Sequence, residues 1–172
     1  MTPDTKDWTW VIDRPCPECG YDAARVQRAD IPGQIQASAA AIAARANVTQ
    51  RPDSSTWSPL EYACHARDVC ALYAARLDLM LTQDDPEYPN WDQDETAEQD
   101  RYSEQDPAEV ADQLTSAAAR LATELSLVTG EQWGRPGRRS DGASFTIDTF
   151  ARYLLHDLVH HAWDVTGVQA HS

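Results

Sequence analysis

The sequence lacks any long apolar run, and its charge is strongly one-sided. No stretch approaches the roughly 20 apolar residues that a membrane-spanning helix needs. Lysine and arginine together number 14 against 28 aspartate and glutamate residues, so the formal net charge is −14. Because a chain with this charge has no general positive field, we expect neither nucleic acid nor an anionic membrane as a partner.

Export signals and a disulfide framework are also missing. The first residues, Met1 to Trp8, carry no positive segment followed by an apolar one. Only four cysteines occur in 172 residues, too few for a disulfide scaffold at this length. We therefore expect reduced thiols and a cytoplasmic location. The length fits one domain with a single core, spanning 1–172 with an irregular segment over 1–30.

Four segments have the apolar spacing and the boundary residues of amphipathic helices. The second has the clearest start, since Ser58, Pro59 and Glu61 form a capping box. Asp106 and Pro107 open the third in the same way. The predicted helices run over 32–47, 59–81, from 107 to the stop at Gly130, and 146–166.

A long acidic segment separates the second and third of these helices. Residues 83–106 contain ten acids against one base, Arg101. A connection of this length inside a compact domain needs a structural reason, and a crossover between two parallel helices of a bundle supplies one. The predicted fold class is therefore all-α, a four-helix bundle with a long crossover between helices 2 and 3. Only a short stretch near 143–145 indicates a strand.

Histidines in the second and fourth predicted helices form a candidate metal site. His156 and His160 lie four residues apart, so their imidazoles stack one turn apart on one helix face, whereas His161 is rotated away from them. His65 lies at the centre of the second helix, which a bundle can bring to the middle of the fourth. Three neutral imidazoles leave a coordination position open, as in catalytic sites. On spacing alone, ordinary core histidines stay an alternative. His171 lies in the C-terminal tail and is not a candidate ligand.

The segments Trp57–His65 (WSPLEYACH) and His156–His161 (HDLVHH) resemble the DinB/YfiT-like superfamily in their order and helix placement. The chain most resembles the actinobacterial branch of that superfamily, close to mycothiol-dependent enzymes, over roughly residues 30–166. That family is a four-helix bundle with an up-down-down-up path. One histidine of its second helix and a His-x-x-x-His pair of its fourth hold a divalent metal, often zinc or nickel. The resemblance therefore implies His65, His156 and His160 as the ligands.

The resemblance also implies an activity. Family members of known activity use small thiols, as mycothiol- or bacillithiol-dependent S-transferases and a maleylpyruvate isomerase do. The implied function is a metal-dependent transferase in which a thiol such as mycothiol, the co-substrate, attacks a small electrophile. Asp164 and Asp68 could hold the N–H groups of the ligand histidines, with ordinary solvated acids as the favoured alternative for each. Bundles of this kind often form homodimers, although no residue here argues for one.

Two other functions stay open on the sequence. A non-catalytic metal-binding or stress-associated protein is one, because the sequence supplies no compelling nucleophile or general base beyond the metal. A metal-dependent hydrolase is the other, because His156–His160 differs by one residue from the H-E-x-x-H of zinc proteases. Asp157 is one methylene shorter than the glutamate of that motif, and few residues follow the pair.

The segment Cys16-Pro17-Glu18-Cys19-Gly20 looks like one knuckle of a zinc ribbon. A closed zinc site needs two more ligands, and the sequence has no second Cys-x-x-Cys. Cys64 or Cys70 could contribute only if the N-terminal segment folded back onto the second helix. A redox-active dithiol stays an alternative, and we expect ordinary thiols in a glycine turn.

A cluster of positive charge, Arg135, Arg138 and Arg139, stands just before the fourth predicted helix. A loop with three arginines near a helix N-terminus can receive a carboxylate or phosphate. These residues are therefore the candidate site for an anionic thiol or acid, with a solvated loop as the alternative.

Overall fold

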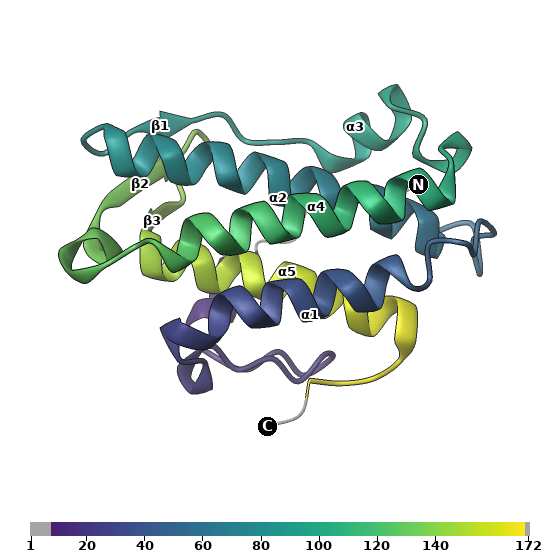
Figure 1. Cartoon of the computed structure of the whole chain (residues 1–172), viewed down its shortest axis with the longest axis horizontal. Coiled ribbons are helices and arrows are strands. Elements are labelled where there is room, and N and C mark those ends of the chain that lie inside the picture. The colour runs from purple at the N-terminus through teal and green to yellow at the C-terminus, as the bar shows by residue number, and fades with distance from the viewer. Residues whose placement is uncertain (1–7, 171–172) are drawn as a thin grey trace.

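The computed structural model describes residues 8–170 as a bundle of four long helices with a small sheet at one end (Figure 1). The expectations for residues 1–7 and for His171 lie outside the described residues. The long helices are α1 (Ile31–Ala43), α2 (Pro59–Thr82), α4 (Pro107–Ser126) and α5 (Ile147–Thr166). Across 8–170, none of the helices has the length and apolar character needed to cross a membrane.

Side-chain caps fix where the long helices begin. The Ser58 hydroxyl accepts from the Glu61 N–H, and the Glu61 carboxylate accepts from the Ser58 N–H at 2.8 Å, so the predicted capping box is confirmed. Asp106 caps α4 by accepting from the N–H of Glu109 at 2.9 Å. Such caps satisfy N–H groups that the helix leaves unpaired, which is why these boundaries could be predicted closely.

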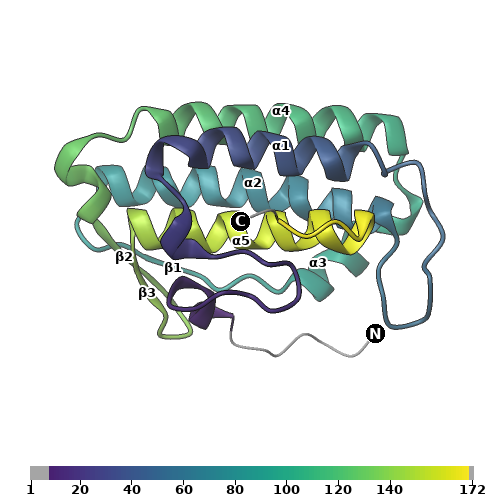
Figure 2. The same cartoon turned by 90° about the horizontal axis from the view of Figure 1, so that it is seen from below.

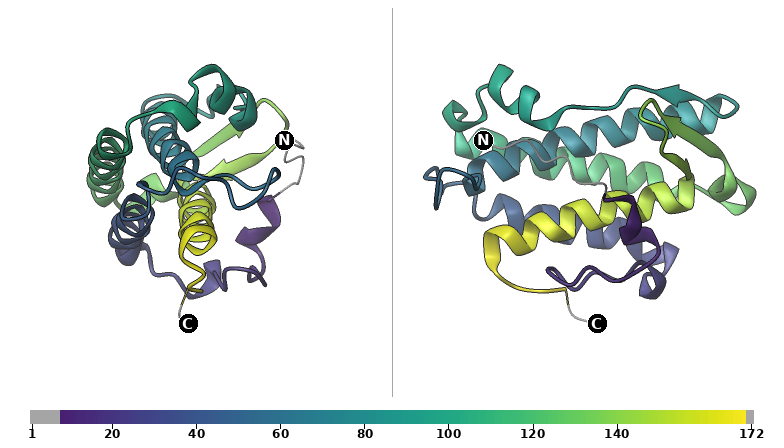
Figure 3. Two further views of the ribbon diagram at one scale, coloured as in Figure 1. Left: turned by 90° about the vertical axis from the view of Figure 1, so that its right-hand side faces the viewer. Right: turned by 180° about the vertical axis from the view of Figure 1, so that it is seen from behind.

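The four long helices enclose one core. α4 and α5 each pack against both α1 and α2, as the end-on view shows (Figure 3). Burial of each large apolar side chain stabilises the fold by about 1.5–3 kcal/mol. Fully buried members of the core include Ile35, Ile42, Leu60, Leu77, Leu114, Leu121, Phe150 and Leu154. Few polar side chains are buried with them, and two of these are His65 and His156.

The acidic segment 83–106 has more structure than a linker. In Figure 1 it leaves α2 at one end of the bundle and returns along the outside to the other end, where α4 begins. It forms β1 (Glu87–Tyr88), α3 (Gln93–Gln99) and a 3-10 turn over Tyr102–Glu104. The Tyr102 ring is completely buried and its hydroxyl donates to Asp68, so the segment is anchored on α2.

A three-stranded sheet corrects the expectation of an all-α fold. β2 (Pro136–Arg139) pairs in parallel with β1 and antiparallel with β3 (Ser144–Thr146). β2 lies so close to the end of α2 that a Cβ on Gly137 would stand 2.8 Å from the Met80 Cγ. The sequence did not predict β1 or β2, because two residues and a Pro-Gly-Arg-Arg stretch show no alternation of apolar and polar side chains.

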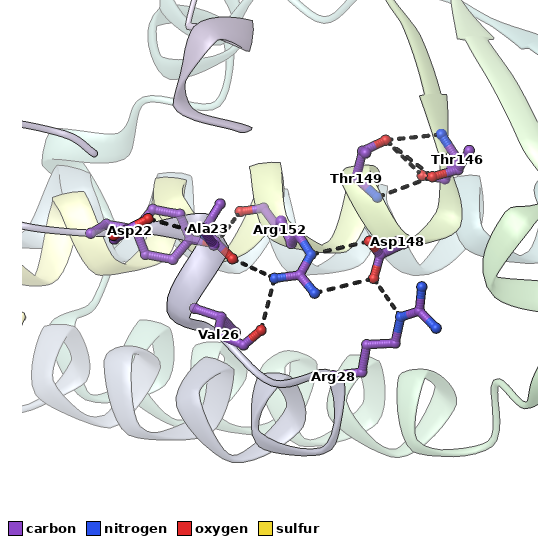
Figure 4. A network of polar contacts seen from close by, with 10 residues as sticks. Asp22, Ala23, Val26, Arg28, Thr146, Asp148, Thr149 and Arg152 are labelled. Atoms are coloured by element: carbon purple, nitrogen blue, oxygen red, sulfur yellow. Dashed lines mark hydrogen bonds and ion pairs between the residues drawn. The ribbon is translucent and has the colours of Figure 1, made fainter. Parts of the chain in front are cut away.

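The N-terminal segment lies along α5 (Figures 2 and 3). It contains only the 3-10 turns Thr9–Ile12, Ala23–Arg25 and Arg28–Asp30, so contacts with the bundle must hold it. The Arg152 guanidinium donates to the carbonyls of Ala23 and Val26, the latter at 2.8 Å (Figure 4). Arg28 and Arg152 both donate to the Asp148 carboxylate, which joins the segment to the first turn of α5.

We predict that Asp148→Asn destabilises the chain in a pH-dependent way. Burial alone would raise the pKa of Asp148, but hydrogen bonds from Arg28 and Arg152 lower it below the ordinary value. A lowered carboxyl pKa stabilises the folded state above the unfolded pKa, and this stability is lost as the pH falls below about 4. Near neutral pH the substitution should lower the free energy of unfolding, measured by urea denaturation, by about 1–2 kcal/mol.

The exposed Asp78→Asn on α2 is the matched control and should unfold like the wild type. If Asp148→Asn differs from the wild type equally at neutral and acid pH, the ionised carboxylate is not what holds the segment.

Candidate metal centres

The first cluster of potential metal ligands joins the middle of α2 to α5. It consists of His65, Asp157 and His161, and we call it the histidine–carboxylate cluster; its donor atoms all lie within 4.8 Å of one another. His65 Nε2 is 3.5 Å from Asp157 Oδ2, and His161 Nε2 is 3.6 Å from Asp157 Oδ1. Two imidazoles and one carboxylate from two helices therefore point at a common centre.

Several buried ligand atoms in this cluster have no hydrogen bond of good geometry. This holds for both ring nitrogens of His65 and for Oδ2 of Asp157, where the nearest approach is the 3.5 Å between His65 Nε2 and Asp157 Oδ2. Buried polar atoms in proteins are nearly always paired, because leaving one unpaired costs about 1–3 kcal/mol. Nitrogen and carboxylate donors in this arrangement suit zinc and related divalent ions. The cluster therefore fits a metal ion better than it fits a closed set of internal hydrogen bonds.

Neighbouring side chains orient the two imidazoles. Trp91 stacks on the His65 ring with 5.4 Å between centroids, and Trp57 stands 5.3 Å from it. His161 Nδ1 lies 2.8 Å from Asp164 Oδ2, an arrangement that places the proton on Nδ1 and leaves Nε2 as a donor to the cluster. Carboxylates in this position are typical partners of metal-binding histidines.

Of the two predicted supporting acids, the structure places only Asp164 beside candidate ligands. Asp68 instead accepts hydrogen bonds from Arg67 and from the Tyr102 hydroxyl. The expectation that Asp68 holds His65 is therefore wrong. Asp68, three residues after His65 on α2, instead binds the Tyr102 hydroxyl of the crossover segment.

A cavity of about 790 Å³ adjoins the histidine–carboxylate cluster, with His65 and Asp157 in its wall. Two guanidinium groups, those of Arg76 and Arg139, also line it. Arg76 is 5% exposed, and its Nε is buried without a hydrogen-bond partner. Burial lowers the pKa of Arg76, whereas hydrogen bonds to Asp141 and Tyr153 outweigh burial and raise the pKa of Arg139. The cavity thus combines a candidate metal centre with one buried and one partly buried guanidinium.

The three arginines predicted to bind an anion are separated by their positions in and before β2. Arg135 donates to the carbonyls of Met80 and Gln83 at the end of α2, at 2.6 and 2.7 Å. Arg138 forms an ion pair with Asp85. Only Arg139 lines the cavity, because successive side chains of a strand point to opposite sides. The arginine cluster is therefore not one site, and Arg76 was missed altogether.

The second cluster brings the N-terminal segment to α5. Cys16, Cys19, His156 and His160, which we call the cysteine–histidine cluster, have donor atoms within 4.8 Å of one another. Cys16 Sγ lies 3.7 Å from His160 Nδ1. Burial together with the nearby His160 lowers the pKa of His156 to about 4, so its ring is neutral at physiological pH, the form that binds metals.

The predicted triad of His65, His156 and His160 is therefore not brought together. The structure pairs His156 with His160, as their spacing predicted, but places His65 with Asp157 and His161 instead. Side chains of adjacent residues on a helix point about 100° apart. A shift of one position along α5 therefore decides whether the pair His156 and His160 or the pair Asp157 and His161 faces α2. Asp157 and His161 have the same four-residue spacing, which was the available signal for this second pair.

The family model described as the DinB superfamily matches residues 33–165. The chain belongs to the DinB superfamily. The solved structure of YfiT from Bacillus subtilis, described as a probable metal-dependent hydrolase with an unusual four-helix bundle topology, is similar to this chain with a TM-score of 0.74. That similarity covers 90% of this chain and 91% of YfiT at 18% sequence identity, so it supports the fold alone.

No curated protein matches the chain in sequence. The region that matches the DinB family covers one of the two clusters completely and the other only in part. Residues 33–165 include the whole histidine–carboxylate cluster, whereas Cys16 and Cys19 come before it. The first cluster is thus built from the DinB bundle itself, and the second needs the N-terminal segment.

Proposed function

We propose that this chain is a metal-dependent enzyme whose divalent ion is held by His65, Asp157 and His161. The observation that carries the proposal is the set of buried, unpaired donor atoms beside a cavity of about 790 Å³. A purely structural cluster would satisfy these atoms internally. The position of the cluster inside the DinB-matched region supports the same conclusion.

Three protein donors leave coordination positions for a reactant, as in catalytic zinc sites. Zinc or nickel bound there would act as a Lewis acid and lower the pKa of a bound water or thiol. Neighbouring residues orient the ligand atoms: Asp164 fixes the proton of His161, and Trp57 and Trp91 pack against the His65 ring.

The cavity offers arginine side chains to a small anionic molecule. Its wall carries both signs of charge, so an anion would bind through individual guanidiniums and not through a general positive field; the charged residues are Arg76, Arg139, Asp92, Asp94, Asp141 and Asp157. Arg76 Nε is buried without a hydrogen-bond partner and can donate to a carboxylate, phosphate or sulfonate. Arg139, held by Asp141, stands in the same wall.

For the reaction, we propose transfer of a low-molecular-weight thiol such as mycothiol to a small electrophile. No cysteine is among the described residues that line the cavity, so the sulfur nucleophile would come from a co-substrate. Its sulfur forms a bond to the electrophilic carbon, the leaving group departs with its electron pair, and the thiol proton goes to the leaving group or to solvent. The resemblance to the mycothiol-dependent branch of the family supports this choice.

Hydrolysis is the second candidate. YfiT, whose fold this chain shares, is described as a probable metal-dependent hydrolase. In a hydrolase, water would take the place of the thiol at the same open positions, and the electrophile would be an ester or amide. A non-catalytic metal-binding protein is the remaining alternative.

The decisive assay compares both reactions on metal-loaded protein. We expect consumption of mycothiol in the presence of an electrophile panel, and loss of this turnover in His65→Ala and Asp157→Asn. Asp78→Asn, which is exposed on α2, is the matched control and should keep it. Turnover of esters or amides without thiol would favour the hydrolase. Full metal occupancy without turnover in either assay would indicate a binding protein.

Asp164→Asn should weaken metal binding at the histidine–carboxylate cluster by about 10- to 100-fold, because the histidine would lose its charged partner. Calorimetric titration of metal-free C16S/C19S protein with Zn²⁺ isolates this cluster from the other one. In that background, Asp68→Asn should leave the affinity unchanged, since Asp68 contacts Arg67 and Tyr102 instead of His65. Equal losses from both variants would show that Asp164 has no special role.

Arg139→Gln should raise KM for the anionic substrate about 10- to 100-fold, the effect of losing one hydrogen bond to a charged group, with a smaller change in kcat. Arg120→Gln on the exposed face of α4 removes the same charge far from the cavity and serves as the control. A rise in KM that is equally large for Arg120→Gln would mean that only the overall charge matters.

A further inference from the structure

We propose that Cys16, Cys19, His156 and His160 bind a second metal ion, a closed structural Zn²⁺ that joins the N-terminal segment to α5. This site shares no ligand with the proposed catalytic one. Two thiolates and two neutral imidazoles are a complete donor set for structural zinc, with no position left for a reactant.

The distances within the cluster agree with a tetrahedral zinc site. With zinc bonds of about 2.3 Å to sulfur and 2.0 Å to nitrogen, a sulfur and a nitrogen ligand stand about 3.5 Å apart. Cys16 Sγ and His160 Nδ1 are 3.7 Å apart, and all four donors lie within 4.8 Å of one another. Bringing the four donors to one ion therefore needs only small side-chain rotations.

The turn that carries the cysteines has the backbone of a metal knuckle. The N–H of Gly20 donates to the carbonyl of Cys16 at 3.0 Å, and the N–H of Cys16 donates to the carbonyl of Tyr21 at 2.8 Å. Gly20 has φ +78°, a left-handed conformation that favours glycine. A Cβ there would also lie 3.2 Å from the carbonyl oxygen of Ala170. The closed turn thus presents both sulfurs to the same face of α5.

Unpaired and buried groups point to an occupant of this cluster. Nε2 of His156 is buried without a hydrogen-bond partner. Cys16 and Cys19 are free thiols that are 2% and 0% exposed. A redox-active dithiol needs a sulfur that a partner can reach, whereas both of these sulfurs are buried. Burial therefore argues against the redox alternative, and the approach of two histidines argues against ordinary thiols.

His160 also has partners on the ring atom that faces away from the cluster. Its Nε2 lies 3.5 Å from a carboxylate oxygen of Glu18 and 3.9 Å from one of Asp164. This leaves Nδ1, the atom that faces Cys16, as the metal donor, with acids behind the ring as metal-bound histidines usually have. The Trp8 ring packs in a tilted orientation against the rings of His156 and His160, with ring centroids at 5.6 and 5.3 Å.

Cobalt titration of the metal-free full-length chain tests the site, because thiolate-bound Co²⁺ shows a charge-transfer absorption in the near ultraviolet and strong tetrahedral bands in the visible. We expect both for the wild type and for His65→Ala, and their loss in the double variant C16S/C19S. Cys70→Ala, which removes a buried cysteine outside both clusters, is the matched control and should keep them. Zn²⁺ should displace the cobalt and abolish the bands.

Two outcomes would overturn the proposal. One is a wild type that takes up cobalt without any thiolate charge-transfer band, and the other is a band that persists in C16S/C19S. The wild-type titration decides even if the double variant fails to fold. Loss of activity in His65→Ala with the cobalt band retained would separate the two sites, so each proposal can fail alone.

Trypsin cleavage tests the structural role. Arg25 is exposed in the N-terminal segment and is followed by Val26, a bond that trypsin can cleave. With Zn²⁺ bound to the wild type and to His65→Ala, cleavage after Arg25 should be slow, and chelation should accelerate it in both. Equal cleavage rates with and without Zn²⁺ in a protein that shows the cobalt bands would mean that the ion does not hold the segment.

Discussion

The rotation of α5 about its own axis decides what both candidate sites contain. His156 and His160 lie on one face of this helix, and Asp157 and His161 lie on the adjoining face, about 100° away. The core side chains of α5, such as Phe150, Leu154 and Leu158, fix the rotation by packing against the other helices. With this setting, Asp157 and His161 face α2, and the other pair faces the N-terminal segment.

The two clusters are neighbours that share a supporting acid. One oxygen of Asp164 lies 2.8 Å from His161 Nδ1, and the other lies 3.9 Å from His160 Nε2. The two clusters nevertheless suit different tasks, because one combines imidazoles with a carboxylate beside a cavity and the other combines imidazoles with buried thiols. The donor types therefore separate an open centre from a closed one along a single helix.

Local signals made much of the fold predictable from the sequence. The caps at Ser58 and Asp106 and the apolar spacing of the long helices act within a few residues, and the four helices are confirmed. The partition of the histidines depends on tertiary packing, which spacing alone does not encode. The approach of Cys16 to His160, 144 positions later in the chain, has no local signal either. The strand near 143–145 was predicted, whereas β1 and β2 were not, because they show no alternation of apolar and polar side chains and Gly137 of β2 contributes by lacking a side chain against Met80.

Anomalous X-ray diffraction from zinc-loaded crystals, recorded on both sides of the zinc absorption edge, tests the account most directly. We expect one zinc peak among His65, Asp157 and His161 and a separate peak among the ligands of the cysteine–histidine cluster. A single peak bound jointly by His65, His156 and His160 would contradict it, because α5 would then be rotated differently from the arrangement described here.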